Sequence, residues 1–292
     1  MPSTATSMVV HSAIADLRDA VAKARADGAR VGFVPTMGAL HRGHISLVER
    51  ANRDADVTVM SIFVNPLQFG PGDDLSKYPR PVDQDERMAE EAGVDILFRP
   101  EASDMYPGDR AITVTSGELG SDWEGKSRPG HFDGVLTVVA KLFNIVQPDF
   151  AVFGRKDLQQ AALVQALVRD LNIPLSIVWA PIVREDDGLA LSSRNRYLSS
   201  DERRRATILS KALASVRLSF TAGERNTQML ESTGRRIMEA EGDVKPDYFA
   251  VVDPATFKRA ETSEPNFAAI VAARVGKTRL IDNMIIGSDD QD

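Results

Sequence analysis

Short apolar runs typical of buried strands alternate with helix-like segments along the first part of this 292-residue chain. The strand-like runs cover residues 31–34, 57–64, 94–98, 150–153 and 175–179. Segments with apolar side chains at helical spacing cover residues 13–27, 45–51, 81–93, 135–146 and 159–171. This alternation predicts an α/β fold, a Rossmann-like parallel sheet with helices on both faces. Such sheets bind ligands beyond the carboxyl ends of their strands.

The pattern changes after Tyr197. The residues from Ser199 to Glu202 have the spacing of a capping box and open a charged helix, and a second helix is expected over residues 226–240. Three strand-like runs follow and suit a small antiparallel sheet, at residues 248–252, 268–274 and 280–286. We therefore expect a Rossmann-like domain, residues 1–183, and a smaller α+β C-terminal domain, residues 184–292. The acidic tail, residues 288–292, is expected to be disordered.

The overall charge and composition exclude several classes of protein. A net charge of −7 and a pI near 5.3 argue against a nucleic-acid partner, because phosphate-backbone binding needs basic patches. The chain has no cysteine, which excludes disulfides and a thiol nucleophile. Residues 1–10 lack the pattern of a secretory signal, and no apolar run has the length of a membrane span. We expect a cytoplasmic protein without a membrane partner.

Two of the four histidines, His41 and His44, stand three residues apart where a helix follows the first strand. This spacing places both imidazoles on one face of the first turn. The N–H groups and positive dipole end of a helix start attract anions, and Gly38 and Gly43 let a phosphate approach the backbone. The alternative is a pair of surface or helix-capping histidines. Two histidines in register with two glycines favour a nucleotide site.

Other candidate ligand groups also follow strand-like runs. Asn65 and Gln68 carry neutral amides suited to the oxygens of a small polar substrate, although Asn-Pro is also a common loop former. Lys156 stands in the first turn of a helix, where the dipole opposes its charge and a bound anion would stabilise it. The alternative for Lys156 is an ordinary solvated lysine.

A loop at the predicted domain junction, residues 184–196, interleaves hydroxyl and guanidinium groups. Ser192 and Ser193 can donate to phosphate oxygens and Arg194 can clamp them, so the loop is a candidate mobile lid. In a second polar loop, Arg128 and His131 are possible anion contacts, with a structural role as the stronger alternative. The acidic pairs at 73–74 and 186–187 lack metal-ligand spacing and are expected to be solvated. No residue is assigned to a metal.

Four motifs in register resemble the pantoate–β-alanine ligase family of the nucleotidylyl-transferase superfamily. They are Pro-Thr-Met-Gly-Ala-Leu-His-x-Gly-His from residue 35, Ser-Ile-Phe-Val-Asn-Pro-x-Gln-Phe from 61, Lys-Asp-x-Gln-Gln from 156 and Arg-Glu-x-Asp-Gly-Leu-Ala-x-Ser-Ser-Arg-Asn from 184. The similarity runs from about Val31 to Leu198. Beyond it, the chain is only loosely similar to the family, at residues 247–248 and 279–283.

The resemblance implies that ATP and pantoate give pantoyl adenylate and pyrophosphate, and that β-alanine then displaces AMP to give pantothenate. It implies His44 as proton donor and His41 as phosphate ligand, with Lys156 and Arg194 also catalytic. Gln68 and Gln160 would bind pantoate. The implied ATP-binding residues are Met37, Gly38, Ala39, Leu40, His41, Arg42, Gly43, His44, Gly154, Arg155, Lys156, Asp157, Val183, Leu191, Ser192, Ser193 and Arg194. Mg²⁺ would accompany the triphosphate, and the smaller domain would be the lid of a homodimer.

Two positions depart from the family pattern. Arg155 stands where a glutamate is common, and Leu158 where an aromatic residue is common. Both flank Lys156, so they bear on local geometry or ATP affinity more than on the reaction. Two other functions remain open at this point: another adenylyl- or cytidylyl-transferase, whose acceptor pocket need not contain Gln68 and Gln160, and a non-catalytic nucleotide sensor.

Overall fold

The computed structural model of the chain describes residues 7–71, 73, 75–261 and 266–287, so the predicted disordered tail lies outside the described residues. Contacts divide the chain into two compact units. The first comprises residues 1–154 and 163–180, and the second comprises residues 155–162 and 181–292. No helix in the described part of the chain is both long and apolar enough to span a membrane.

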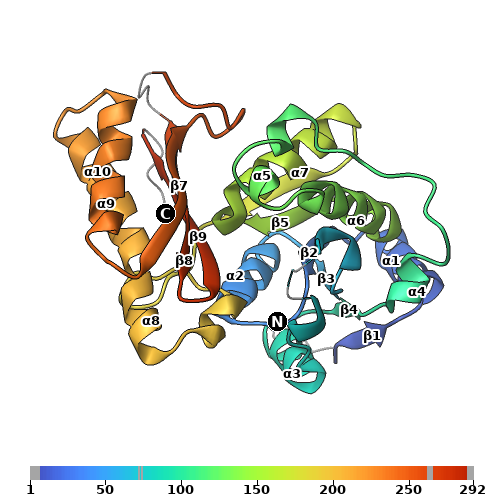
Figure 1. Cartoon of the computed structure of the whole chain (residues 1–292). Coiled ribbons are helices and arrows are strands. Elements are labelled where there is room, and N and C mark those ends of the chain that lie inside the picture. The colour runs from blue at the N-terminus through green and yellow to red at the C-terminus, as the bar shows by residue number, and fades with distance from the viewer. Residues whose placement is uncertain (1–6, 72, 74, 262–265, 288–292) are drawn as a thin grey trace. The chain divides into compact units, whose positions relative to one another are not determined.

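The first unit is built on a six-stranded sheet of order β1-β4-β3-β2-β5-β6, in which every neighbouring pair is parallel (Figure 1). Its strands are β1 (Val9–His11), β2 (Val31–Thr36), β3 (Val57–Ile62), β4 (Ile96–Phe98), β5 (Phe150–Gly154) and β6 (Ser176–Ala180). Its helices are α1 (Ile14–Ala26), α2 (Arg42–Ala51), α3 (Val82–Glu91), α4 (Ala102–Met105), α5 (Glu124–Ser127), α6 (His131–Val146) and most of α7 (Leu158–Asp170). Short 3₁₀ turns are η1 (Pro66–Gln68), η2 (Leu75–Lys77) and η3 (Glu118–Gly120).

Successive strand residues bury their side chains in two different cores. Phe33 packs in a cluster with residues of α1, α6 and α7, whereas Val34, the next residue, packs with residues of α2 and α3. Adjacent side chains of a strand point to opposite faces of the sheet. A sheet covered on both faces therefore needs continuous apolar strands, which explains the unbroken runs in the sequence. The predicted fold class is confirmed.

Several element boundaries differ from the prediction. The edge strand β1 was not expected, since its pairing with β4 leaves Val9 at 47% and Val10 at 39% exposure and gives no buried run. Helix α6 begins at His131, four residues before the predicted start at residue 135. Its N-cap is Gly130, which has a left-handed φ of 79°. Pro81 is the N-cap of α3 rather than its first residue. The connection between β3 and α3 contains η1 and η2.

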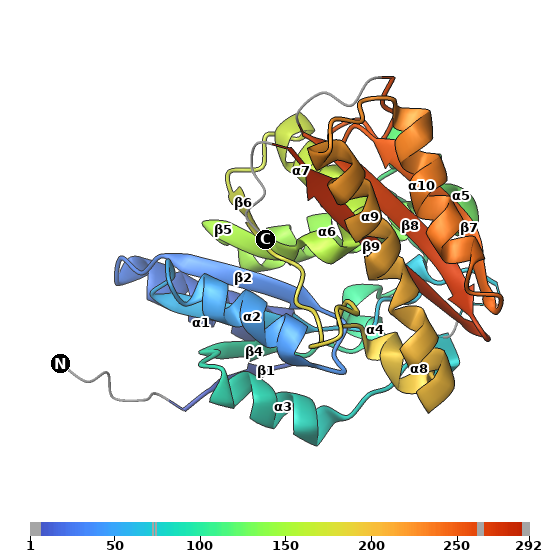
Figure 2. The ribbon, with the colours of Figure 1, turned by 90° about the vertical axis from the view of Figure 1, so that its left-hand side faces the viewer.

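The second unit pairs a three-stranded antiparallel sheet with a layer of helices. The strands are β7 (Val244–Val252), β8 (Phe267–Val275) and β9 (Thr278–Ile286), and the helices are α8 (Ser200–Ala206), α9 (Ile208–Thr221) and α10 (Thr227–Glu239). The 3₁₀ turns η4 (Arg155–Asp157) and η5 (Ser193–Tyr197) also belong to it. Figure 2 shows α9 and α10 side by side on one face of the sheet. Gly234 of α10 allows close packing, because a Cβ there would lie 2.1 Å from Phe249 Cζ.

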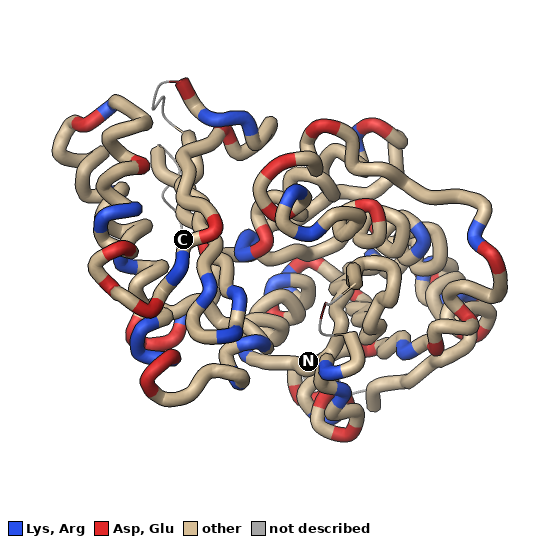
Figure 3. Tube along the Cα trace, in the orientation of Figure 1, with Lys and Arg blue, Asp and Glu red and all other residues tan. Residues whose placement is uncertain are grey.

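The predicted capping box is present: Ser199 Oγ accepts from the N–H of Glu202, and Glu202 accepts from the N–H of Ser199. The charged helix that it opens, α8, ends at Ala206, and α9 begins at Ile208 after the single residue Thr207. Basic and acidic residues interleave around α8 (Figure 3), where Arg203 pairs with Asp187 and Arg205 with Asp201. Asp187 is exposed, as expected for a solvated loop charge, and it also forms this ion pair with Arg203.

Candidate active site

The strand order reverses between β2 and β5. Strands β3, β4 and β1 lie on one side of this pair, and β6 lies on the other. The connections after β2 and β5 therefore run in opposite directions, and open parallel sheets bind ligands at the carboxyl ends of the strands that flank such a reversal. The motif that starts at Pro35 leaves β2 at this point, and Gly154 ends β5. The fold thus places the motif that starts at Pro35 at its topological switch point, together with Gly154.

A buried carboxylate shapes the turn between β2 and α2. Asp85 of α3 is 2% exposed, and its two oxygens accept the N–H groups of Ala39 and Leu40, each at 2.8 Å. Ala39 has the left-handed φ of 51°, which the paired acceptors hold in place. A Cβ on Gly38 would lie 2.8 Å from Asp85 Oδ2, so only glycine fits there. Asp85 supports the backbone of this turn, and the sequence analysis missed it.

His41 is the N-cap of α2, with its Nδ1 accepting from the N–H of Gly43 at 3.1 Å. The alternative of a helix-capping histidine is therefore correct for His41. The N–H of Gly43 already donates to this side chain. An accepting Nδ1 assigns the proton of the neutral ring to Nε2. The rings of His41 and His44 are in contact, with centroids 4.1 Å apart and planes tilted by 35°. His41 therefore combines a structural cap with a donor on its other nitrogen.

Gln68 is held against the turn by a chain of side-chain hydrogen bonds. Gln68 is buried, and its Nε2 lies 3.1 Å from Met37 Sδ while its Oε1 accepts from Asn65 Nδ2 at 3.1 Å. Asn65 Oδ1 accepts from the Tyr106 hydroxyl and the N–H of Leu67. Burial raises the pKa of Tyr106 to about 12, which keeps the phenol a donor. Asn65 therefore has a structural role. Gln68 lies beside Met37 of the turn and stays a candidate substrate ligand.

Arg128 and His131 hold the backbone of Gln68 rather than standing open to an anion. Arg128 Nη2 donates to the carbonyl of Gln68 at 3.2 Å and to Asp73 Oδ2 at 3.0 Å, and His131 Nδ1 lies 2.8 Å from the same carbonyl. Burial acts to raise the pKa of Asp73, but the Gly70 N–H and Arg128 hold it below its usual value. Asp73 is therefore paired, against the expectation of a solvated loop charge.

In the second unit, residues 183–191 form a small hairpin. Arg184 bridges Ala190, and the N–H of Leu191 donates to the carbonyl of Val183 at 2.9 Å. Arg184 is anchored to buried Asp282 of β9 by two hydrogen bonds of 2.7 and 3.0 Å. Beyond the hairpin, Ser192 Oγ accepts from the N–H of Arg194 and so begins η5. The segment expected to be a mobile lid is a folded part of this unit.

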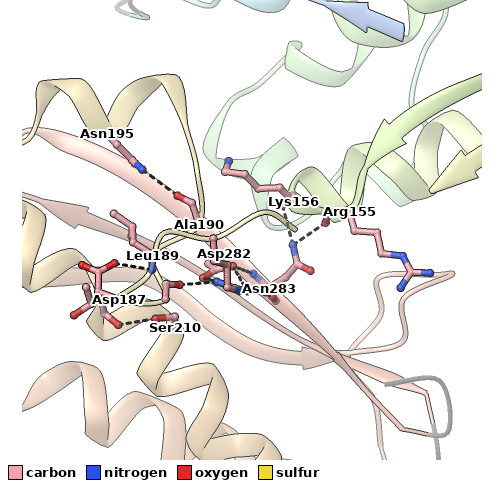
Figure 4. Close-up of polar contacts among 12 residues, drawn as sticks. Arg155, Lys156, Asp187, Leu189, Ala190, Asn195, Ser210, Asp282 and Asn283 are labelled. Carbon is pink, nitrogen blue, oxygen red and sulfur yellow. Dashed lines mark hydrogen bonds and ion pairs between the residues drawn. The ribbon is translucent and has the colours of Figure 1, made fainter. Parts of the chain in front are cut away.

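The turn that carries Lys156 belongs to the second unit as well. The side-chain amide of Asn283 donates to the carbonyls of Arg155 and Lys156, at 3.0 and 2.8 Å (Figure 4). Figure 4 shows the side chains of Arg155 and Lys156 pointing in different directions from this turn. Since Asn283 holds backbone oxygens, the unusual Arg155 does not disturb the contact. Leu158 is buried, so an apolar side chain fits its position.

The structure groups the predicted site residues into two sets, one in each unit. One set lies in the first unit and contains Met37, Gly38, Ala39, Leu40, His41, Arg42, Gly43, His44, Gln68 and Gly154. The other lies in the second unit and contains Arg155, Lys156, Asp157, Gln160, Val183, Leu191, Ser192, Ser193 and Arg194. Asp85, Asp282 and Asn283 support these sets and were missed. For the last two, the loose similarity at residues 279–283 was the available signal.

The switch-point sheet, its histidine-capped helix and the separate lysine turn define a nucleotide-binding α/β enzyme. The sequence profile of the pantoate–β-alanine ligase family matches residues 9–285, and the chain belongs to this family. The resemblance found in the four motifs is thereby confirmed.

The similarity covers nearly the whole length of individual relatives. The pantothenate synthetase of Caldicellulosiruptor saccharolyticus is 48% identical, over 96% of this chain and 99% of the relative. The crystal structure of pantothenate synthetase from Thermus thermophilus has a TM-score of 0.92 and 46% identity, with 96% and 100% of the chains covered. The ligase from Francisella tularensis, complexed with β-γ ATP and β-alanine, has a TM-score of 0.78 and 35% identity, covering 95% and 97%. The chain is accordingly an enzyme that joins pantoate to β-alanine.

Proposed function

We propose that this enzyme makes pantothenate in two steps, through an acyl adenylate. In the first step, a carboxylate oxygen of pantoate attacks the α-phosphorus of ATP, and pyrophosphate leaves. In the second, the amine of β-alanine attacks the acyl carbon, AMP leaves and the amine loses a proton. The observation that supports this best is the 3.1 Å contact between Gln68 Nε2 and Met37 Sδ. It puts an amide suited to a carboxylic acid beside the proposed ATP turn.

The histidines at the start of α2 have distinct roles in this proposal. His41 holds its Nδ1 on the helix cap, so its Nε2–H is the group that donates to a phosphate oxygen. His44, whose ring contacts that of His41, is the proton donor to the phosphate that gains charge. Neither role requires a covalent nucleophile.

The second set of residues supplies positive charge and hydroxyl donors. Lys156, half-buried with 22% of its side chain exposed, and Arg194 neutralise phosphate oxygens, and Ser192 and Ser193 donate to them. Positioned cations of this kind stabilise the in-line transition state more than the bound ground state. In this proposal Val183 and Leu191, the two ends of the hairpin, line the nucleotide site.

Gln68 and Gln160 are the proposed pantoate ligands. The thioether of Met37 is a weak hydrogen-bond acceptor, so a hydroxyl or carboxylate oxygen of the substrate would be a better partner for Gln68 Nε2. The hydrogen bond from Asn65 orients the Gln68 amide before substrate arrives. Such preorganisation lowers the entropic cost of binding.

Mg²⁺ accompanies the triphosphate in this proposal. The ion commonly keeps several waters and binds phosphate oxygens with one or two carboxylates. In the described ranges no cluster of three His, Cys, Asp or Glu side chains could hold a metal by itself. Asp157, with 51% of its side chain exposed and its Oδ1 4.0 Å from Lys156 Nζ, is a candidate carboxylate in the second unit.

The proposal extends to the state of the protein in the cell. We infer a homodimer in the cytoplasm, where ATP is abundant, with residues 184–292 shielding the adenylate from water. Light scattering on the purified protein tests the dimer, and cell fractionation tests the location. Pantothenate made per AMP released tests the shielding, because an unshielded adenylate would hydrolyse.

Isotope exchange tests the adenylate step directly. The purified enzyme is mixed with ATP, Mg²⁺, pantoate and labelled pyrophosphate, without β-alanine. We expect label to enter ATP in a pantoate-dependent manner. An absolute requirement for the amine would contradict the two-step route. Exchange without pantoate, or with an unrelated acid, would instead indicate a different acceptor.

A further inference from the structure

Asn283 joins the two segments of the second unit that carry the proposed phosphate ligands. Its Nδ2 donates to the carbonyls of Arg155 and Lys156, at 3.0 and 2.8 Å. Its own carbonyl accepts from Arg184 Nη2 at 3.2 Å. Asn283 is 3% exposed, so water does not compete for these hydrogen bonds. A single residue of β9 therefore contacts both the lysine turn and the root of the hairpin.

Asp282, the residue before Asn283, binds the hairpin through Arg184. It is 3% exposed and accepts two hydrogen bonds from Arg184, whose Nη1 also donates to the carbonyl of Gly188. Asp282 Oδ1 also accepts the N–H of Asn283 at 2.8 Å. Burial raises the pKa of Asp282, and the charges of Arg184 and Lys156 oppose that shift. The hairpin and the lysine turn are thus attached to one strand (Figure 4).

We propose that Asn283 is a positioning residue for Lys156, holding its turn at a fixed place relative to the hairpin that leads to Arg194. This inference rests on the proposed roles of Lys156 and Arg194. Asn283 acts on the lysine through the backbone: it binds the carbonyl of Lys156 and leaves the side chain to reach a phosphate. Small displacements of a catalytic group are costly, because the transition state tolerates little misalignment.

A double-mutant cycle tests this role. Asn283→Ala should lower the kcat of pantoate-dependent pyrophosphate exchange about 10–100-fold, with little change in the KM for pantoate. In a Lys156→Ala background, the same substitution should lower kcat less than about threefold, because the residue that it positions is gone. Asn283→Ser, which retains one donor, should recover part of the activity.

The matched control is Asp247→Asn, which breaks the ion pair between Asp247 and Arg279 on the same sheet. It should leave kcat within about twofold of wild type, although it too weakens a contact between β9 and another segment of the second unit. Circular dichroism and thermal melting identify which variants are folded. The cycle can be completed with Asn283→Ser if the alanine variant does not fold.

Two outcomes would overturn the inference. If an Asn283 substitution lowers kcat by the same factor with and without Lys156, the two residues act independently. If kcat, ATP binding and pantoate KM all worsen in proportion to lost thermal stability, Asn283 is only structural. Full activity of Lys156→Ala alone is a different result, since it would refute the proposed role of the lysine itself.

Discussion

Replacing Asp85 with asparagine should destabilise the first unit substantially, although the two side chains have nearly the same shape. The carboxylate accepts two backbone N–H groups at 2.8 Å in a site with 2% exposure. Asparagine keeps one neutral acceptor and turns an NH₂ group toward the other N–H. Hydrogen bonds to charged groups contribute about 1.5–3 kcal/mol, and a buried unsatisfied donor costs a similar amount. Because one hydrogen bond is lost and the other is weakened, we expect the free energy of unfolding to fall by about 2–4 kcal/mol.

Tryptophan fluorescence reports on this unit alone. The chain has two tryptophans, Trp123 and Trp179, and both lie in the first unit. With a urea m-value of about 2 kcal/mol/M, the expected loss lowers the unfolding midpoint by about 1–2 M. The release of Ala39 from its left-handed conformation should also weaken pantoate-dependent pyrophosphate exchange, because the proposed ATP turn loses its fixed shape.

Asp83→Asn is the matched control, since Asp83 is exposed and lies in the same first turn of α3. Both substitutions remove one negative charge near the helix N-terminus, which costs about 0.3–1 kcal/mol. The difference between the two variants therefore isolates the buried hydrogen bonds. An Asp85→Asn midpoint within about 0.3 M of the Asp83→Asn midpoint would refute the role given to the carboxylate.

Three further predictions concern the first unit. His41→Asn should preserve the free energy of unfolding within about 0.5 kcal/mol, because asparagine is a good N-cap. Its kcat should nevertheless fall about 10²–10³-fold, because the Nε2 donor is lost. Near-normal turnover would rule out phosphate binding by His41. Gln68→Ala should raise the pantoate KM while calorimetry finds ATP affinity nearly unchanged; equal losses for both ligands would mean that Gln68 is structural. Asp73→Asn should reduce the free energy of unfolding at neutral pH by about 1 kcal/mol or less. The Asp73 pKa is below its usual value in the folded state, so this stabilisation should persist down to about pH 4 and disappear below it. Urea titrations of both proteins across this pH range test it. If the difference in the free energy of unfolding between variant and wild type stays constant, the pairing with Arg128 is contradicted.

Much of the candidate site could be predicted because its signals are local in sequence. The paired His41 and His44, the hydroxyls of Ser192 and Ser193 and the lysine at a helix start each follow a recognisable run of neighbours. The role of each individual residue was harder to predict from the sequence. That His41 would use one nitrogen as a helix cap depends on the backbone conformation of Gly43, and that Arg128 would pair with Asp73 depends on how two loops fold.

The sequence by itself determined the architecture, because helical periodicity records the buried face of each helix and continuous apolar runs record strands that are buried on both faces. It also determined the capping box at Ser199, where both partners lie within three residues. Only the tertiary structure decided which distant groups meet: Asp85 with the turn at Ala39, and Asn283 with the carbonyl of Lys156, 127 residues away. The physical reason is that a backbone N–H or carbonyl is the same in every residue. A side chain that binds one leaves no pattern in the sequence around its partner.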